Sequence, residues 1–287
     1  MTEETELGRL DRRRSRGGGV GQGRLVLAFV LALLVIAAYS GTRSYDPEAE
    51  EVPAVRITPD QEVALGLQAA PVMARQYGGL LPDAKTQILV DRICHALVTR
   101  TAARDTAYDY DCHVLADGAT VDAFALPGGQ VFLTAGLLDK LRTEGQLAAA
   151  LVHEICHVVD RDGAEHMARQ RLGEGLTGAA VLAAYDGNNP ASRRNVGVGL
   201  LIGQLINLRF DPQDEVAADR LAVRLLAEAG YDPRALIEVN RTLRENARFG
   251  PPPELFRTHP DPPDRIGNLE TAIRQRFPRG VPAGLKP

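Results

Sequence analysis

The feature that most constrains the fold of this 287-residue chain is an apolar helical pattern at residues 143–160. Its apolar residues recur at helical spacing, which predicts a helix that is buried along most of its surface. His153, Glu154 and His157 lie within this pattern. Residues four apart share one face of a helix, so the two imidazoles can point toward one place. Polar groups are costly to bury without a partner, so the two buried histidines are expected to share a common partner.

These three residues form an HExxH motif, a pattern typical of a zinc site. Zinc binds imidazole nitrogen, and catalytic sites use three protein ligands and leave a fourth position open. A glutamate beside the first histidine can accept a proton from a water on the metal. The motif therefore predicts one Zn²⁺ per chain, held by His153 and His157, with Glu154 as the general base. Two core histidines beside a surface carboxylate are the alternative.

A second acidic pattern lies on the helix predicted at residues 212–229. Glu215 is the candidate third zinc ligand. Asp219 follows one turn later on the same face, where it can hydrogen-bond a ligating histidine and fix its tautomer. A run of charges is also typical of a solvated helix face. Spacing alone leaves both interpretations open.

HExxH followed by a distant Glu-x-x-x-Asp resembles the gluzincin metallopeptidases, and more narrowly the family of CAAX prenyl proteases, HtpX and BepA. Residues 123–129 are similar to the family's Asn-Ala-Phe-Ala-x-Pro-Gly-Gly signature, and residues 258–260 to its His-Pro motif. The resemblance covers residues 58–277. It implies an α+β, zincin-like metallopeptidase domain, mainly helical, with a small sheet whose edge strand borders the active site.

The resemblance also implies roles for single residues. Glu215 becomes the third zinc ligand, and Asp219 becomes the carboxylate that supports a ligating histidine. His259 either stabilises the oxyanion of the reaction or occupies the fourth zinc position, and a loop histidine held by prolines is the alternative. Arg265 either supports the loop of His259 or lies on the surface. Three other histidines match no ligand position and are expected to be structural or exposed: His95, His113 and His166.

The strand predicted at residues 121–126 is implied to be the edge strand over the active site. Its residues Ala123, Phe124 and Ala125 are expected to bind an extended peptide by main-chain pairing, which tolerates many sequences. Asp122 stands where the family has Asn. A charge at this position could alter the preference for substrate.

The rest of the globular sequence alternates helical and strand patterns. Thr58-Pro59-Asp60 is typical of a helix start. The turn Pro127-Gly128-Gly129 joins two strands into a predicted hairpin. Further helices are predicted at 83–100, 164–172 and 265–276, with one more opened by Asp232-Pro233; strands at 108–116 and 130–134; a helical hairpin at 174–209; and a proline-rich loop at 251–263.

The N-terminal sequence predicts targeting to a membrane. Residues 1–24 are basic and are expected to stay in the cytoplasm, and an uncharged apolar run follows within 25–41. The run is short for a spanning helix and long for a signal peptide, so a cleaved signal and an uncleaved anchor both remain open. A linker at 42–57, a peptidase domain at 58–280 and a tail at 281–287 complete the expected organisation.

Composition narrows the function classes. The net charge of −4 predicts no strongly basic face, so nucleic acid is not an expected partner. Cys94, Cys112 and Cys156 form no CxxC pair, which leaves thiolate zinc sites unsupported. The first two cysteines pair in an oxidising compartment, or all three are small buried side chains. A single apolar segment and the lack of a tetratricopeptide extension argue against prenyl processing and against an assembly-chaperone role.

The sequence thus predicts a zinc-dependent metalloendopeptidase that hydrolyses misfolded or misassembled proteins in the bacterial cell envelope. Its catalytic domain is expected in the periplasm, either anchored to the inner membrane or exported after cleavage of the signal. Its expected partners are protein or peptide substrates and, through the N-terminus, the membrane. The alternative is a zinc-stabilised chaperone or binding protein that holds extended polypeptide and cleaves little. Residues 174–209 or His259 are further expected to cover the metal and make the enzyme latent.

Overall fold

The computed structural model describes residues 57–167, 203–205, 207–250 and 252–287. The predicted targeting segment at 25–41 lies outside them, as does most of the predicted hairpin at 174–209. Across the described residues, no helix combines the length and the apolar character that crossing a membrane requires.

Helices surround a small sheet, which confirms the predicted α+β, mainly helical class. The described elements are α2 (Pro59–Gln76), α3 (Ala84–Thr99), η1 (Ala102–Asp105), β1 (Asp111–Leu115), β2 (Ala123–Leu126), β3 (Gln130–Thr134), α4 (Ala135–Leu138), α5 (Glu144–Val159), α9 (Pro212–Ala229), α10 (Ala235–Phe249), α11 (Leu255–Thr258) and α12 (Arg265–Arg276).

Short polar side chains begin the helices where the sequence predicts them. Thr58 and Gln61 form a capping box at the start of α2, and the Thr143 side chain accepts the Gln146 N–H at the start of α5. Such caps satisfy backbone donors that have no partner within the helix. Gly230 ends α9 in the left-handed conformation, with φ of 95°. Helix boundaries therefore follow directly from local chemistry.

Two predicted segments differ in detail. The strand expected at 108–116 is shorter, because only Asp111–Leu115 lie in register with β3. The loop expected at 251–263 contains the short helix α11. Its Thr258 carbonyl accepts the Phe210 N–H at 2.9 Å, so the loop is fixed to the segment that leads into α9.

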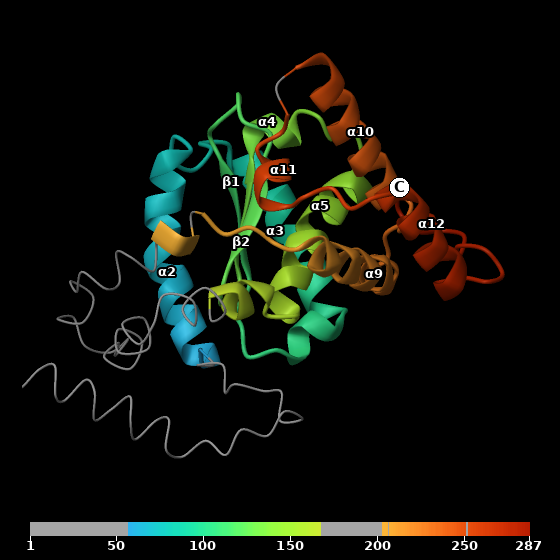
Figure 1. Cartoon of the computed structure of the whole chain (residues 1–287), viewed down its shortest axis with the longest axis horizontal. Coiled ribbons are helices and arrows are strands. Elements are labelled where there is room, and N and C mark those ends of the chain that lie inside the picture. The colour runs from blue at the N-terminus through green and yellow to red at the C-terminus, as the bar shows by residue number, and fades with distance from the viewer. Residues whose placement is uncertain (1–56, 168–202, 206, 251) are drawn as a thin grey trace, which may run out of the picture. The chain divides into compact units, whose positions relative to one another are not determined.

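The three strands have the order β1-β3-β2 (Figure 1). β1 runs parallel to β3, and β2 runs antiparallel to it with Phe124 opposite Phe132. Gly128 and Gly129 form the turn between β2 and β3 with φ of 84° and 104°. A Cβ at Gly128 would lie 2.4 Å from the Cα of Val63. The predicted hairpin is confirmed, and its turn requires glycine because α2 packs directly against it.

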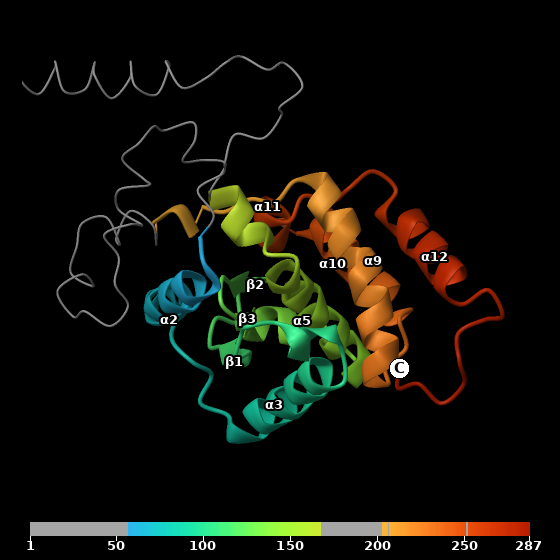
Figure 2. The same ribbon diagram turned by 90° about the horizontal axis from the view of Figure 1, so that it is seen from below.

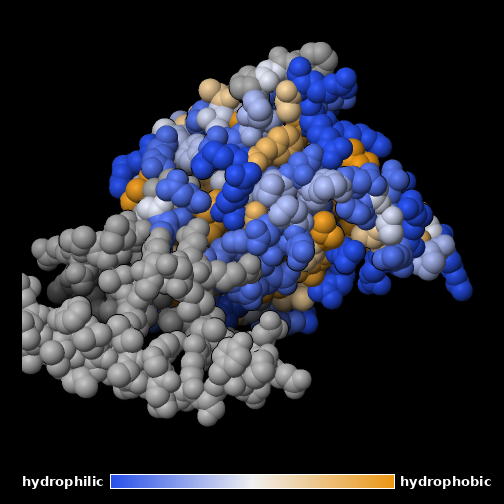
Figure 3. Space-filling model, in the orientation of Figure 1, coloured by the Kyte–Doolittle hydropathy of each residue, from blue (hydrophilic) through white to orange (hydrophobic). Residues whose placement is uncertain are grey.

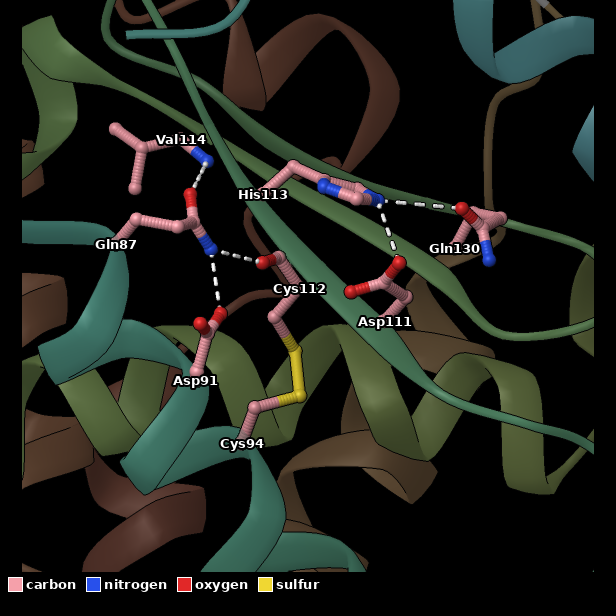
Figure 4. Close-up of a disulfide and its surroundings, with 8 residues drawn as sticks. All are labelled: Gln87, Asp91, Cys94, Asp111, Cys112, His113, Val114 and Gln130. Atoms are coloured by element: carbon pink, nitrogen blue, oxygen red, sulfur yellow. Dashed lines mark hydrogen bonds and ion pairs between the residues drawn. A yellow bond between two sulfur atoms is a disulfide. The ribbon is translucent and has the colours of Figure 1, made fainter. Parts of the chain in front are cut away.

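The outer edge of β1 is occupied (Figure 4). A disulfide joins Cys94 of α3 to Cys112 of β1, which resolves the two alternatives for these cysteines. The Gln87 amide donates to the Cys112 carbonyl at 2.7 Å and accepts the Val114 N–H at 3.3 Å. The Leu81 N–H also donates to the Val114 carbonyl, at 2.8 Å. A disulfide that closes a loop of this size contributes about 3 kcal/mol to stability.

The outer edge of β2 is different. Within the described part of the chain, no backbone hydrogen bond reaches the outer side of the strand between Ala123 and Ala125. Figures 1 and 2 show β2 beside α5, which lies between the sheet and the helices α9 and α10. An edge strand with free backbone groups can accept a further strand. The predicted edge strand is therefore placed next to the helix that carries the HExxH motif.

The visible face of the described chain is mostly polar. Figure 3 shows apolar residues there as scattered points rather than as one broad patch. Apolar side chains instead fill the interior, where α5 is buried from Gly145 to Val158. Each Leu, Val or Ile buried in this way contributes about 1.5–3 kcal/mol. The core thus holds α5 rigidly, together with the polar residues it carries.

Candidate active site

α5 places His153, Glu154 and His157 in the interior, with side chains that are almost completely buried. α9 crosses α5 and brings Glu215 against the two histidines. His153 Nε2 lies 3.3 Å from Glu215 Oε2, and His157 Nε2 lies 3.5 Å from Glu215 Oε1. The two Nε2 atoms are 3.3 Å apart. The structure therefore brings together all three residues predicted to bind zinc.

These distances fit the edges of a coordination tetrahedron. With zinc–nitrogen and zinc–oxygen distances of about 2.0–2.1 Å, neighbouring ligand atoms lie about 3.3 Å apart. Both Glu215 oxygens and His259 Nε2 are buried without a hydrogen-bond partner among the described residues. Atoms of His153, His157, Glu215 and His259 lie within 4.8 Å of one another. Buried polar atoms that converge without hydrogen bonds fit a common ligand, and nitrogen and carboxylate donors suit zinc.

A carboxylate lies beside the Nδ1 atom of each of the two histidines on α5. Asp219 Oδ1 lies 3.2 Å from His153 Nδ1, as predicted. Asp162 Oδ2 lies 2.7 Å from His157 Nδ1. A carboxylate that accepts the Nδ1–H fixes the tautomer and leaves the Nε2 lone pair free for a metal. This contact of Asp162 was not predicted from the sequence. Its place five residues after His157, just beyond the helix end, could have suggested it.

Arg265 has a larger role than predicted. It is buried, so the surface alternative is wrong, and its guanidinium binds both oxygens of Asp219 at 2.7 and 2.8 Å. Its Nη2 also lies 3.1 Å from Glu215 Oε2. Arg265 therefore braces the carboxylates of α9 from the start of α12.

Phe210 is a second residue that the sequence analysis missed. Its ring stacks on the His157 ring with centroids 4.0 Å apart and planes at 4°. It also lies 4.9 Å from the His259 ring. The hydrogen bond from its backbone N–H to Thr258 holds it there. Phe210 excludes water from one side of the histidine cluster, but an isolated Phe in sequence gives no sign of this contact.

The electrostatics of the cluster favour a bound cation. Burial opposes the charged form of both imidazoles, yet contacts with Asp219 and Glu215 raise the pKa of His153. Contacts with Asp162 and Glu215 likewise outweigh burial and raise the pKa of His157 to about 10. Burial alone would raise the pKa of Glu215, but the neighbouring imidazoles hold it well below its usual range. The carboxylates thus favour positive charge on or between the two imidazoles, and protons supply it when no metal is bound.

His259 and Glu154 lie on the open side of the cluster. His259 Nε2 is 3.4 Å from Glu154 Oε2, and this carboxylate oxygen has no hydrogen-bond partner among the described residues. Thr258 Oγ1 donates to the Leu255 carbonyl and lies 2.9 Å from His259 Nδ1. Because that hydroxyl proton is already used, the hydroxyl oxygen acts as the acceptor in this contact and His259 Nδ1–H as the donor. His259 follows α11 in a loop, and its Nε2 atom is directed toward the cluster.

The remaining histidines lie away from the cluster. His95 is exposed, and His113 contacts Gln130 and Asp111 on the sheet (Figure 4). His166 is buried and binds Asp214 at 2.7 Å, which agrees with a structural role.

Asp122, at the start of the edge strand, has a buried carboxyl group. Tyr77 Oη donates to Asp122 Oδ2 at 2.8 Å, while Oδ1 is buried and has no partner among the described residues. Burial raises the pKa of Asp122 to about 7 against the effect of that bond, and the charges of Glu154 and Glu254 raise it further. The charge that the sequence suggested at this position is therefore only partly present near neutral pH.

We expect Asp122→Asn to stabilise the protein at high pH. The ordinary carboxyl pKa of 3.8 applies in the unfolded chain, so between pH 3.8 and about 7 only the folded state keeps the proton. Stability therefore falls as pH rises through this window, by on the order of 4 kcal/mol, and the loss is complete above it. Urea unfolding at about pH 4 should show equal stabilities, and at about pH 8 the variant should be more stable.

Asp117→Asn is the matched control for this prediction. The Asp117 carboxylate accepts hydrogen bonds from Thr120 and Ala119 that lower its pKa, so this substitution should destabilise at high pH. An Asp122→Asn variant no more stable than the parent at pH 8 would show that Asp122 is not buried as described.

Comparison with known proteins assigns the chain that carries this cluster to a family. A model of peptidase family M48 matches residues 84–273, more than half of the 287-residue chain. The chain belongs to peptidase family M48. Its M48 domain is that of a zinc metalloendopeptidase, and the cluster of His153, His157, Glu215 and His259 could hold the ion.

Relatives of the M48 domain include bacterial and mitochondrial proteases. The beta-barrel assembly-enhancing protease of Escherichia coli is 27% identical over 263 residues, which are 88% of this chain and 53% of the relative. That of Yersinia pestis is 28% identical over 225 residues, 76% of this chain and 45% of the relative. The mitochondrial metalloendopeptidase OMA1 of Schizosaccharomyces pombe is 30% identical over 214 residues, 74% of this chain and 60% of the relative. The chain spans about half the length of the bacterial relatives it matches.

Proposed function

We propose that the protein is a zinc-dependent endopeptidase of the bacterial cell envelope that hydrolyses misfolded or misassembled proteins. The buried cluster of His153, His157 and Glu215, with Glu154 beside it, carries the proposal. The bacterial relatives are named as proteases that enhance β-barrel assembly, which supports this substrate class. The M48 domain itself supports peptide hydrolysis.

His153, His157 and Glu215 are the proposed ligands of one zinc ion. When bound, the ion supplies an activated water and polarises the scissile carbonyl. Asp219 and Asp162 orient the two imidazoles through their Nδ1 atoms, so that both Nε2 atoms face the same point. Because ligand positions are fixed by buried partners, the site is organised before the substrate arrives.

Glu154 is the proposed general base. Its Oε2 atom has no competing hydrogen bond among the described residues, so it is available to take a proton from the attacking water. The same carboxyl then passes this proton to the leaving amine. Burial alone would raise the pKa of Glu154, but the neighbouring His259, His153 and His157 lower it, so the carboxyl is ionised and can accept a proton.

His259 has two proposed roles that its geometry supports. With Nδ1–H bound by Thr258, its Nε2 lone pair can fill the fourth ligand position in a resting state. Once protonated at Nε2, the same ring can donate to the oxyanion that forms during hydrolysis. Both roles use the Nε2 atom of His259. The centroid of its ring lies 5.1 Å from that of the His157 ring.

The edge strand is the proposed substrate-binding element. The backbone groups of Ala123 and Ala125 face away from β3 and can pair with an extended polypeptide laid beside α5, while Phe124 lies between them, opposite Phe132. Such pairing reads the backbone rather than particular side chains. It therefore suits an enzyme whose substrates share an unfolded segment and not a sequence.

The location in the envelope is also proposed. The apolar run within residues 25–41 is proposed to act as a signal peptide or as an anchor, which would place the M48 domain in the periplasm. The disulfide between Cys94 and Cys112 supports an oxidising compartment.

Metal content and casein cleavage, measured in parallel on the full-length protein, test the function. We expect one zinc per chain, cleavage that stops when a chelator removes the metal, and recovery when zinc is restored. Zinc binding without cleavage would instead support a protein that only holds extended polypeptide. Cleavage that persists after removal of the metal would contradict the proposed chemistry.

A further inference from the structure

A small cavity opens beside Glu154 and His259, on the side of α5 that faces α10. We call it the α10 cavity. Its apolar walls are formed by Leu236, Val239 and Leu243. Ala123 of the edge strand also lines it, so a polypeptide paired with β2 would pass its mouth.

The α10 cavity is small and its walls are rigid. Its volume of about 30 Å³ compares with about 10–15 Å³ for the space that one water needs. It therefore accepts a few non-hydrogen atoms. Leu236 and Leu243 are only 2% and 3% exposed and belong to the main hydrophobic core. Core side chains give way only at a cost in packing, so the cavity cannot widen freely.

The role of Glu154 determines which substrate residue enters the α10 cavity. Glu154 lines the cavity and is the group proposed to return the proton to the leaving amine. The leaving nitrogen must then lie within hydrogen-bond reach of this carboxyl. That nitrogen belongs to the residue that follows the scissile bond, so the side chain of this residue lies nearest to the cavity.

We propose that the α10 cavity receives the side chain of the residue that follows the scissile bond and restricts cleavage to sites where that side chain is small and apolar. Alanine fits best, because its single methyl fills space without displacing a wall residue. Leucine and phenylalanine exceed the cavity. The inference rests on the proposed peptidase function and names the residues of α10 that set its selectivity.

Matched peptides test the inference. A casein cleavage site, mapped by mass spectrometry, is copied into peptides that carry Gly, Ala, Val, Leu or Phe directly after the scissile bond. Misfit of even one or two methylenes changes kcat/KM by about 10–200-fold. We expect the parent enzyme to cleave the Ala peptide at least about tenfold faster, by kcat/KM, than the Leu and Phe peptides.

Two substitutions should change this selectivity in opposite directions. Leu243→Ala enlarges the cavity and should raise the Leu-to-Ala ratio of kcat/KM by about tenfold. Val239→Leu fills the cavity and should lower cleavage of the Ala peptide relative to the Gly peptide. Ile237→Ala is the control on the same helix, because Ile237 lines the groove toward α12 and not the cavity. Its ratios should equal those of the parent.

Binding gives a readout that does not need turnover. Calorimetric titration of the same peptides into zinc-loaded Glu154→Gln should rank Ala above Leu, and the added Leu243→Ala substitution should remove this ranking. Equal ratios in the parent, Leu243→Ala and Val239→Leu would overturn the inference while the peptidase function stands. If Leu243→Ala does not fold, Val239→Leu decides, since it removes no core contact. A parent that cleaves no casein contradicts the proposed function, whereas equal binding of all peptides contradicts the cavity.

Discussion

Glu154→Gln is expected to lower kcat for casein cleavage by about 10³-fold while the protein still binds one zinc per chain. Glutamine has nearly the shape of glutamate but cannot accept a proton from water. The three proposed ligands are separate side chains on α5 and α9, so metal binding should survive. Because Glu154 acts on the reacting water and not on substrate binding, KM should change little. Steady-state kinetics and metal analysis of the same preparation check this result.

Glu238→Gln is the control for this substitution. Glu238 lies on α10 and pairs with Arg241 in an exposed contact of 2.7 Å, so the same chemical change should leave kcat unaltered. Loss of zinc from Glu154→Gln would contradict the role of base and indicate a part in holding the metal. Retention of more than about a tenth of the parent rate would mean that another group accepts the proton.

The sequence predicted the elements that local patterns determine. Helix α12 begins and ends at the predicted residues 265–276, and α9 matches 212–229, where Pro212 opens the helix and Gly230 ends it. His153 and His157 could likewise be paired from spacing alone, since one helix carries both. Glu215 could not be added to this pair from spacing, because its contact with α5 depends on how two helices distant in sequence cross. Only the resemblance to a family separated it from a solvated charge.

Other parts of the site depend on contacts that no local pattern encodes. Phe210 stacks on His157 across 53 positions of chain because a backbone bond to Thr258 holds it. Arg265 was predicted either to support the loop of His259 or to lie on the surface, since a lone Arg at a helix start gives no sign that two buried carboxylates face it. The disulfide was one of two alternatives, because spacing does not fix the distance between cysteines. The α10 cavity was not anticipated at all.

The residue for which structure adds most is Arg265, and its removal should be costly. Arg265→Met keeps much of the side-chain volume but removes the guanidinium from Asp219 and Glu215. Breaking one side of a buried ion pair costs about 3–5 kcal/mol, and the two carboxylates would keep only their contacts with His153 and His157. We expect this loss in urea unfolding of the metal-free protein. Arg265→Lys should recover only part of it, because an ammonium cannot bind both Asp219 oxygens in a fork.

Arg274→Met provides the comparison on the same helix. Arg274 pairs with Glu270 at 3.6 Å in an exposed contact, and such pairs contribute about 0–1 kcal/mol. Zinc should reduce the cost of Arg265→Met, because the ion itself neutralises Glu215 where the guanidinium no longer does. A variant equally destabilised with and without zinc would mean that Arg265 acts through packing alone. A variant as stable as Arg274→Met would mean that the two carboxylates do not depend on it.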